Sequence, residues 1–266
     1  MASALFVVWC NNADFVSFTQ IAPSPPYVSS QIPQWTTLMN QSIDRHKTAI
    51  NTLYTKGART IIMPKAVNIA ATPYYSFLGS TNKLFIKART DEYNIAFDAA
   101  IIAHVATKPG LIVYRPDTSA LFEQALATPS AFGLTNTTGY ALSVVANQVA
   151  VGPNSPGSTY LFWDDTHPTA RFQMHLADLV QQMISPVKVN GISRSGNTSQ
   201  LTIANIPLGR QGIVEGSSSL QPPWNQDVTF TQPFSAGGST TGSVNATSTA
   251  PSRFYRVSFP VVWTWP

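Results

Sequence analysis

The stretch LYTKGARTIIMP, residues 53–64, decides the fold class, because it passes from the end of a helix into a buried strand within a few residues. Before it, apolar side chains recur at near-helical spacing from Gln34 to Thr55, and Gly57 is a residue type that commonly ends helices. After it, Thr60 to Met63 is a short apolar run typical of a buried strand. A helix that leads into such a strand indicates an α/β domain with a parallel sheet.

The same alternation of strand and helix patterns extends over residues 1–186, which we interpret as one α/β domain. Outside residues 53–64, we expect strands at Leu5 to Trp9, Leu111 to Tyr114 and Thr159 to Phe162. We expect helices from Asp91 to Ala106 and after Pro168.

Residues 187–266 have a different pattern, with short alternating runs such as Val187–Val189 and Gln200–Ile203 between clusters of Gly, Ser, Asn and Pro. We therefore predict a small all-β module there, similar to the β-modules appended to exported bacterial enzymes. Trp224, Trp263 and Trp265 either form a platform for a surface or polymer contact, or serve as core anchors of the module.

The composition excludes several classes of function. None of the apolar runs in the 266 residues approaches the roughly 18 residues of a membrane span, and the net charge of +4 comes from scattered residues rather than a basic cluster. A membrane-spanning protein and a nucleic-acid partner are therefore not expected. Charged residues make up only 11%, as in many exported proteins, so we expect a secreted or cell-surface parent. This chain itself has no recognisable signal peptide.

The segment FWDDTHPT, residues 162–169, is the strongest candidate for chemistry. It places Asp164 three residues before His167, where a strand ends and a helix begins. In open α/β sheets reactive groups collect at that edge, and a carboxylate there can orient an imidazole that acts as a base. The alternative for this tetrapeptide alone is an aspartate that caps the helix beside a histidine on its surface.

Four segments in order resemble the GDSL-type (SGNH) ester hydrolases, near the plant GDSL lipases and the thermolabile haemolysin-like phospholipases. They are residues 53–64 followed by 69–73, YNIAFDAA at 93–100, PSAFGLTN at 129–136, and residues 162–169. The resemblance covers about residues 4–185 and implies a flavodoxin-like three-layer sandwich. It also implies that His167 is the general base, that Asp164 orients it, and that the substrate is an acyl ester or a lactone.

Two departures from that family stand out. The block Gly-x-Asn-Asp corresponds here to residues 11–14, so the oxyanion position is Ala13, which has no donor; Asn12 can substitute only if the active-site loop, which includes Asp14, shifts by one residue. A Gly-Asp-Ser block does not occur in the 266 residues, which we interpret as an N-terminally incomplete domain with an unassigned nucleophile. Cys10 is either that nucleophile or a small buried hydrophobic residue.

The leading prediction is thus a carboxylic ester hydrolase, and the alternatives are a non-catalytic binding or surface protein on the same scaffold, or a truncated fragment. No cofactor is expected. No metal site is expected either, although a weakly bound Ca²⁺ stays open. The missing strands would leave the strand Leu5–Trp9 as an exposed edge, so we expect a homodimer or an aggregate joined at this strand. Among the other histidines, His46 and His175 are predicted to be solvated and His104 to lie in the core.

Overall fold

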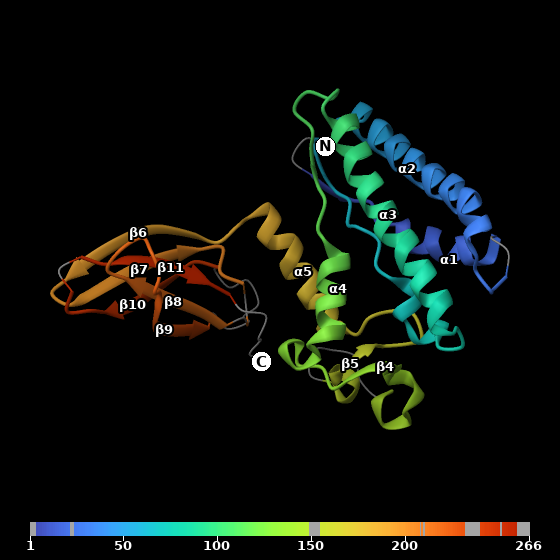
Figure 1. Cartoon of the computed structure of the whole chain (residues 1–266). Helices are drawn as coiled ribbons and strands as arrows, with labels where there is room; N and C mark the ends of the chain where they lie inside the picture. The colour runs from blue at the N-terminus through green and yellow to red at the C-terminus, as the bar shows by residue number, and fades with distance from the viewer. Residues whose placement is uncertain are drawn as a thin grey trace.

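The computed structural model describes residues 4–21, 24–148, 155–207, 209, 211–231, 240–250 and 252–259. It is mixed α/β, with parallel strands in the first part of the chain and antiparallel sheets after it. Figure 1 shows the helices α2 (Ile32–Thr55) and α3 (Ser80–Val105) running alongside each other, and the antiparallel strands gathered beyond the last helix, α5 (Ala170–Ile184). None of the helices in the described ranges has the length and apolar character needed to cross a membrane.

The first sheet has three parallel strands in the order β1-β2-β3. They are β1 (Leu5–Val7), β2 (Thr60–Ile62) and β3 (Ile112–Tyr114), each slightly shorter than expected from the sequence. The strand β1 lies at the edge, where Val7 is 62% exposed. Within the part of the chain that the structure describes, this edge therefore presents apolar side chains and backbone groups with no partner strand, as the sequence predicted.

Three helices pack with this sheet: α1 (Asn11–Ile21), α2 and α3. Their shared core is rich in aromatic rings, with Phe15 edge-on to Tyr93 and Phe18 edge-on to Trp35. The helix α2 begins near Pro33, which is tolerated in a first turn, and ends before Gly57, whose φ of 93° suits glycine. The end of α2 thus confirms the prediction that a helix ends at Thr55, just before Gly57.

The helix α3 begins eleven residues before the predicted Asp91, at Ser80 directly after Gly79 in an extended conformation. Its first turns have no strongly apolar face, since Leu84 is exposed while Ile86 is buried, so the periodic signal becomes clear only further along. The position of the predicted start was wrong, and the existence of the helix was right.

The remaining parallel strands form a separate pair rather than extending the first sheet. They are β4 (Asn136–Tyr140) and β5 (Tyr160–Phe162), paired with an irregular register. The helices α4 (Thr118–Ala127) and α5 pack with this pair around Phe122, Phe162 and Phe172. The short 3-10 helices of the connections are η1 (Ser29–Gln31), η2 (Ile69–Ala71), η3 (Pro73–Tyr75), η4 (Pro129–Phe132), η5 (Ala141–Ser143), η6 (Val145–Asn147) and η7 (Pro156–Thr159).

An ionic cluster joins the end of β2 to its neighbours. Lys65 Nζ lies 3.0 Å from a carboxylate oxygen of Asp98 on α3 and 2.8 Å from one of Asp117, which caps α4. Arg115 also pairs with Asp98. Burial disfavours the charged amine, but hydrogen bonds to the two carboxylates outweigh it and raise the pKa of Lys65. The cluster therefore links three elements through one cation.

After α5 the chain forms two antiparallel sheets of three strands, β10-β7-β6 and β11-β8-β9. Alternate residues of these strands, including Leu201, Ile203 and Val214, face a common core. The strand bounds are β6 (Lys188–Ser195), β7 (Thr198–Ala204), β8 (Gln211–Ser217), β9 (Asn225–Thr231), β10 (Gly242–Thr247) and β11 (Phe254–Ser258). A domain boundary at residue 186 stays a prediction.

Candidate active site

The segment between β5 and α5 holds Asp164 and His167 in a tight loop that folds back on itself. The backbone N–H of Trp163 donates to the carbonyl of His167 at 2.8 Å, and that of Thr169 donates to the carbonyl of Leu161 at 3.0 Å. The Thr169 hydroxyl donates to the carbonyl of Tyr160, and its oxygen accepts from an N–H in the first turn of α5. The loop is therefore fixed at both ends by regular elements.

Within this loop the carboxylate of Asp164 contacts the imidazole ring directly. Its Oδ2 lies 2.8 Å from His167 Nδ1, and its Oδ1 accepts the backbone N–H groups of Thr166 at 2.9 Å and His167 at 2.6 Å. These contacts place the ring proton on Nδ1 and leave Nε2 with its lone pair on the side away from Asp164. Such an imidazole is suited to accept a proton.

The carboxylate is kept ionised by its local contacts. Burial works against ionisation of Asp164, but the N–H groups of His167 and Thr166 and the imidazole outweigh burial, so the pKa of this carboxyl lies below its usual range. The His167 side chain is 73% exposed and that of Asp164 is 35% exposed, so water reaches the pair. Hydrogen bonds within the loop, rather than burial, therefore hold the two side chains in place.

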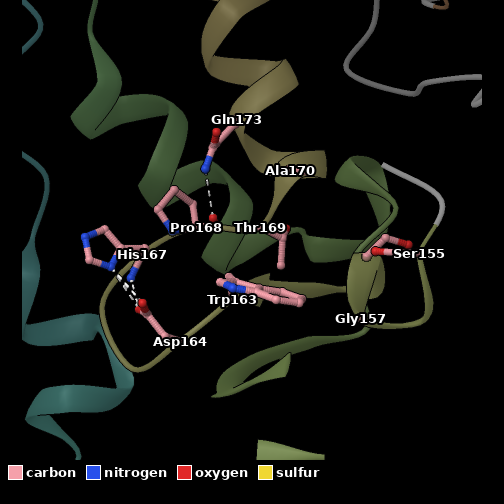
Figure 2. A pocket seen from close by; sticks show the side chains of 10 residues that line it. Ser155, Gly157, Trp163, Asp164, His167, Pro168, Thr169, Ala170 and Gln173 are labelled. Atoms are coloured by element: carbon pink, nitrogen blue, oxygen red, sulfur yellow. Dashed lines mark hydrogen bonds and ion pairs between the residues drawn. The ribbon is translucent and has the colours of Figure 1, made fainter. Parts of the chain in front are cut away.

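A shallow cavity of about 400 Å³ lies beside the pair. Figure 2 shows the Trp163 indole across its floor, with His167 on one side and Ser155 on the other. Gly157 also lines the cavity. A Cβ at this position would come within 2.7 Å of the Ala141 methyl. The close approach of η7 to η5 therefore needs a glycine and shapes one side of the cavity.

The hydrogen bonds of His167 within the described ranges lead to Asp164 and Trp163, and none to a serine hydroxyl. Ser158, which also lines the cavity, is buried and accepts a hydrogen bond from Arg171 at 3.3 Å. Among the residues that the structure describes, the site therefore has an oriented histidine with no nucleophile hydrogen-bonded to it.

The residues predicted for an oxyanion loop lie in a helix instead. Asn12 and Asp14 belong to the first turn of α1, and the backbone N–H of Asp14 donates to the carbonyl of Cys10. The Asn12 side chain oxygen accepts the N–H of Val67, and Asn11 donates to the carbonyl of Pro64. The expectation of a loop was wrong because these asparagines fasten the helix start to the segment after β2. Their role at an oxyanion stays a prediction.

Cys10 is exposed three residues after β1, so the prediction of a small buried hydrophobic residue was wrong, and its Sγ lies 3.4 Å from Nε2 of His46. The expectation that His46 is solvated was wrong, since its ring is buried against Phe97. The sequence offered a signal, because Met39, Ile43 and Ile50 form a buried stripe of α2 and His46 falls on it at helical spacing. Cys10 and His46 belong to separate elements, so no spacing in the sequence indicates that they meet.

The two remaining histidines also differ from expectation. His175 is buried in α5, where Nε2 lies 3.3 Å from the carbonyl of Phe132 and the ring packs against Phe132. His104 lies near the end of α3, where the helix meets solvent, and its Nε2 contacts Asn51. The prediction of surface or core was wrong for all three histidines, because the polarity of neighbouring residues does not show which face of a helix a side chain occupies.

Comparison with known proteins gives two distant relatives and no matching family model. A GDSL esterase/lipase of Arabidopsis thaliana is 29% identical over 139 residues, which is 48% of this chain and 38% of that protein. An acetylesterase of Thermothelomyces thermophilus is 26% identical over 149 residues, or 56% of this chain and 45% of that protein.

The similarity is to GDSL/SGNH-like esterases. The chain spans less than half the length of the curated relatives it matches. Both relatives carry names that describe ester hydrolysis, and the mixed α/β architecture with parallel strands is consistent with a hydrolase of this kind. The GDSL/SGNH-like similarity agrees at the family level with the resemblance inferred from the ordered segments.

Proposed function

We propose that this chain carries the acid–base part of a carboxylic ester hydrolase of the GDSL/SGNH type, acting on acyl esters or lactones. The observation that carries the proposal is the 2.8 Å contact between Asp164 Oδ2 and His167 Nδ1 in a loop fixed at both ends. The distant similarity to two esterases supports it. The proposed scaffold is the three-layer sandwich of that family, with its domain over residues 1–186.

In the proposed reaction, Nε2 of His167 accepts a proton from the attacking hydroxyl group as its oxygen bonds to the ester carbonyl carbon. Asp164 stabilises the resulting imidazolium and keeps the ring oriented. The tetrahedral intermediate then collapses, the bond to the alcohol oxygen breaks, and the imidazolium returns its proton to that oxygen. The net change with water is one ester converted to one acid and one alcohol.

We propose two candidates for the attacking group. Water can serve directly, because the His167 side chain is open to solvent. A serine from a second chain can serve if two copies pair at β1, whose apolar edge is exposed. We propose this pairing as the homodimer contact. A Val7→Lys variant should then sediment as a monomer, and a parent chain that is monomeric at high concentration would contradict the contact.

Hydrolysis of p-nitrophenyl acetate by the purified chain tests the function. We expect turnover above that of buffer, and His167→Ala should reduce it to background. Turnover that is unchanged in His167→Ala would show that the activity does not depend on this pair. A fluorophosphonate probe separates the two attacking groups, because it labels an activated serine and does not label a site that uses water.

A non-catalytic binding or surface protein is the second candidate function. It is favoured by the absence of a serine hydrogen-bonded to His167 among the described residues and by Ala13 at the position expected for an oxyanion donor. This candidate predicts no ester turnover and no reaction with the probe, together with a cooperative thermal transition. A truncated fragment would instead unfold with low cooperativity.

We propose that the two antiparallel sheets after α5 contact a surface or a polymer, and that the parent protein is exported. Trp224 is half-buried, and the Arg256 guanidinium lies over its ring at 4.8 Å, so one face of the indole is already covered. Trp263 and Trp265 lie outside the described residues. The test measures binding of the whole chain to chitin and, separately, to cellulose, and compares it with the Trp224→Ala variant. Equal binding by the parent chain and the variant would show that Trp224 does not take part in the contact.

A further inference from the structure

Three side chains with metal-binding atoms meet away from the Asp164–His167 loop. Cys10 follows β1, Asp14 lies in the first turn of α1, and His46 lies midway along α2. The thiol sulfur, a carboxylate oxygen and a ring nitrogen all lie within 4.8 Å of one another. Residues from three different elements thus present a thiol, a carboxylate and an imidazole to one small volume.

The imidazole of His46 is oriented as a metal ligand needs. The side chain is 1% exposed, and Nδ1 lies 2.8 Å from the carbonyl oxygen of Ser42 in the same helix. That contact places the ring proton on Nδ1, so Nε2 has a free lone pair directed at Cys10 Sγ. Metal-bound histidines are commonly held in this way by a carbonyl behind the ring.

The distances fit a small tetrahedral ion. With Zn–S bonds of about 2.3 Å and Zn–N bonds of about 2.0–2.1 Å, tetrahedral angles place sulfur and nitrogen about 3.5 Å apart. The separation between Cys10 Sγ and His46 Nε2 is 3.4 Å. An ion can therefore bind between these two atoms without a shift of the backbone, and Asp14 needs only a side-chain adjustment to join them.

Asp14 is supported from behind, as ligating carboxylates usually are. The Ser42 hydroxyl donates to its Oδ2 at 2.5 Å, and Arg45 Nη1 lies 3.6 Å from its Oδ1. The Ser42 residue thus orients two of the three groups, one through its carbonyl and one through its hydroxyl. Exposure of Cys10 leaves solvent access for a further ligand.

We propose that Cys10, Asp14 and His46 form a three-ligand site for a thiophilic divalent cation of the zinc type, with a fourth position open to water. A thiolate with an imidazole favours such an ion over Mg²⁺ or Ca²⁺, which prefer oxygen ligands. On binding, the Cys10 S–H bond breaks, its proton leaves to solvent, and a sulfur–metal bond forms. The site goes beyond the proposed ester hydrolysis and does not depend on it.

The alternative is a simple thiol–imidazole hydrogen bond. Burial, followed by the charge of Asp14, raises the pKa of the Cys10 thiol, so without a cation the sulfur keeps its proton and can donate it to His46. A hydrogen-bonded thiol and a metal ligand differ in two measurable respects. Only the ligand gives a sulfur-to-metal electronic transition, and only the ligand releases a proton when metal is added.

The test titrates the whole chain with Co²⁺, followed by absorption, and with Zn²⁺ against a chromophoric chelator. We expect one ion per chain, a thiolate-to-cobalt charge-transfer band, and d–d bands of tetrahedral strength. Cys10→Ser should abolish the band and weaken zinc binding by at least about 100-fold, since loss of a supporting contact alone costs about 10- to 100-fold. The exposed position of Cys10 makes this variant a mild one for folding.

Two further variants keep the result decisive. Ser42→Ala removes the hydroxyl behind Asp14 and should weaken zinc binding about 10-fold, whereas His104→Gln, a partly exposed histidine outside the cluster, should leave it unchanged. The proposal is overturned if Co²⁺ gives no charge-transfer band, or if Cys10→Ser binds zinc as tightly as the parent chain.

Discussion

Replacing Asp164 by Asn separates the orientation of His167 from the mere presence of a polar side chain. The asparagine oxygen can still accept the N–H groups of Thr166 and His167, so the loop should keep its shape. The atom that faces Nδ1 becomes an NH₂ group when that oxygen is so engaged. To accept from it, the ring must move its proton to Nε2, which removes the lone pair needed for catalysis.

The size of the effect follows from the exposure of the pair. A positioned general base contributes about 10²- to 10⁴-fold in rate, with the larger losses found where the carboxylate is buried. Here His167 is mostly exposed, so we expect kcat/KM for p-nitrophenyl acetate to fall about 100-fold, or about 2.7 kcal/mol in activation free energy. The assay compares initial rates of parent, Asp164→Asn and His167→Ala at one pH.

Asp165→Asn is the matched control, because its carboxylate contacts the Thr166 hydroxyl in the same loop and does not reach the ring of His167 among the contacts described. It should retain activity within about twofold of the parent chain. The reasoning is refuted if Asp164→Asn keeps nearly full activity while His167→Ala loses it, since the base would then work without orientation. Thermal denaturation of both variants checks that the fold is retained.

Three further predictions concern stability. Ile50→Ala should lower the free energy of unfolding by about 2–5 kcal/mol because the side chain is fully buried, whereas Ile95→Ala, 74% exposed in α3, should change it by less than about 0.5 kcal/mol, both measured by urea denaturation. Gly157→Ala should lower the free energy of unfolding by about 1–3 kcal/mol, because the added methyl clashes with Ala141, and urea denaturation measures this change. Lys65→Met should lower the free energy of unfolding by about 1.5 kcal/mol. In this variant, thermal stability should also fall less steeply as pH rises into the alkaline range.

The alkaline sign follows from the raised pKa of Lys65. A group with a raised folded pKa contributes stability that is fully present below its unfolded value, here 10.5, and is lost as pH rises through the folded value. Lys56→Met serves as its control for general alkaline effects, and an equal pH dependence in both variants would contradict the assignment. For Gly157 the control is Gly191→Ala, where an added Cβ meets nothing within 4 Å.

The sequence predicted best those elements whose signal is local. The helix α2 and the strand β2 followed from apolar spacing and Gly57, which act within a few residues. The sequence does not predict helix α1, because its first turn reads Asn-Asn-Ala-Asp, which is typical of a loop. Contacts with Pro64 and Val67 fix this turn instead. Such contacts join distant parts of the chain and leave no periodic pattern.

The candidate sites show the same division. Asp164 and His167 lie three residues apart, so a short motif can bring them to attention, and the structure shows their side chains in contact. Cys10 and His46 meet only because β1 and α2 pack together, and no spacing rule connects them. The separation of β4 and β5 from the first sheet depends on strand pairing, which local apolar patterns do not specify.

The parallel pairing of β1 with β2 also sets an expected order of assembly during folding. Leu5 pairs with Thr60, so a long loop must close before this contact forms, whereas Ser195 and Thr198 pair across a tight turn. Loop closure before contact slows nonlocal pairing, and local hairpins form within microseconds. The β6–β7 hairpin should therefore gain hydrogen-exchange protection before β1, and the exposed edge of the first sheet should be among the last parts of the chain to become ordered.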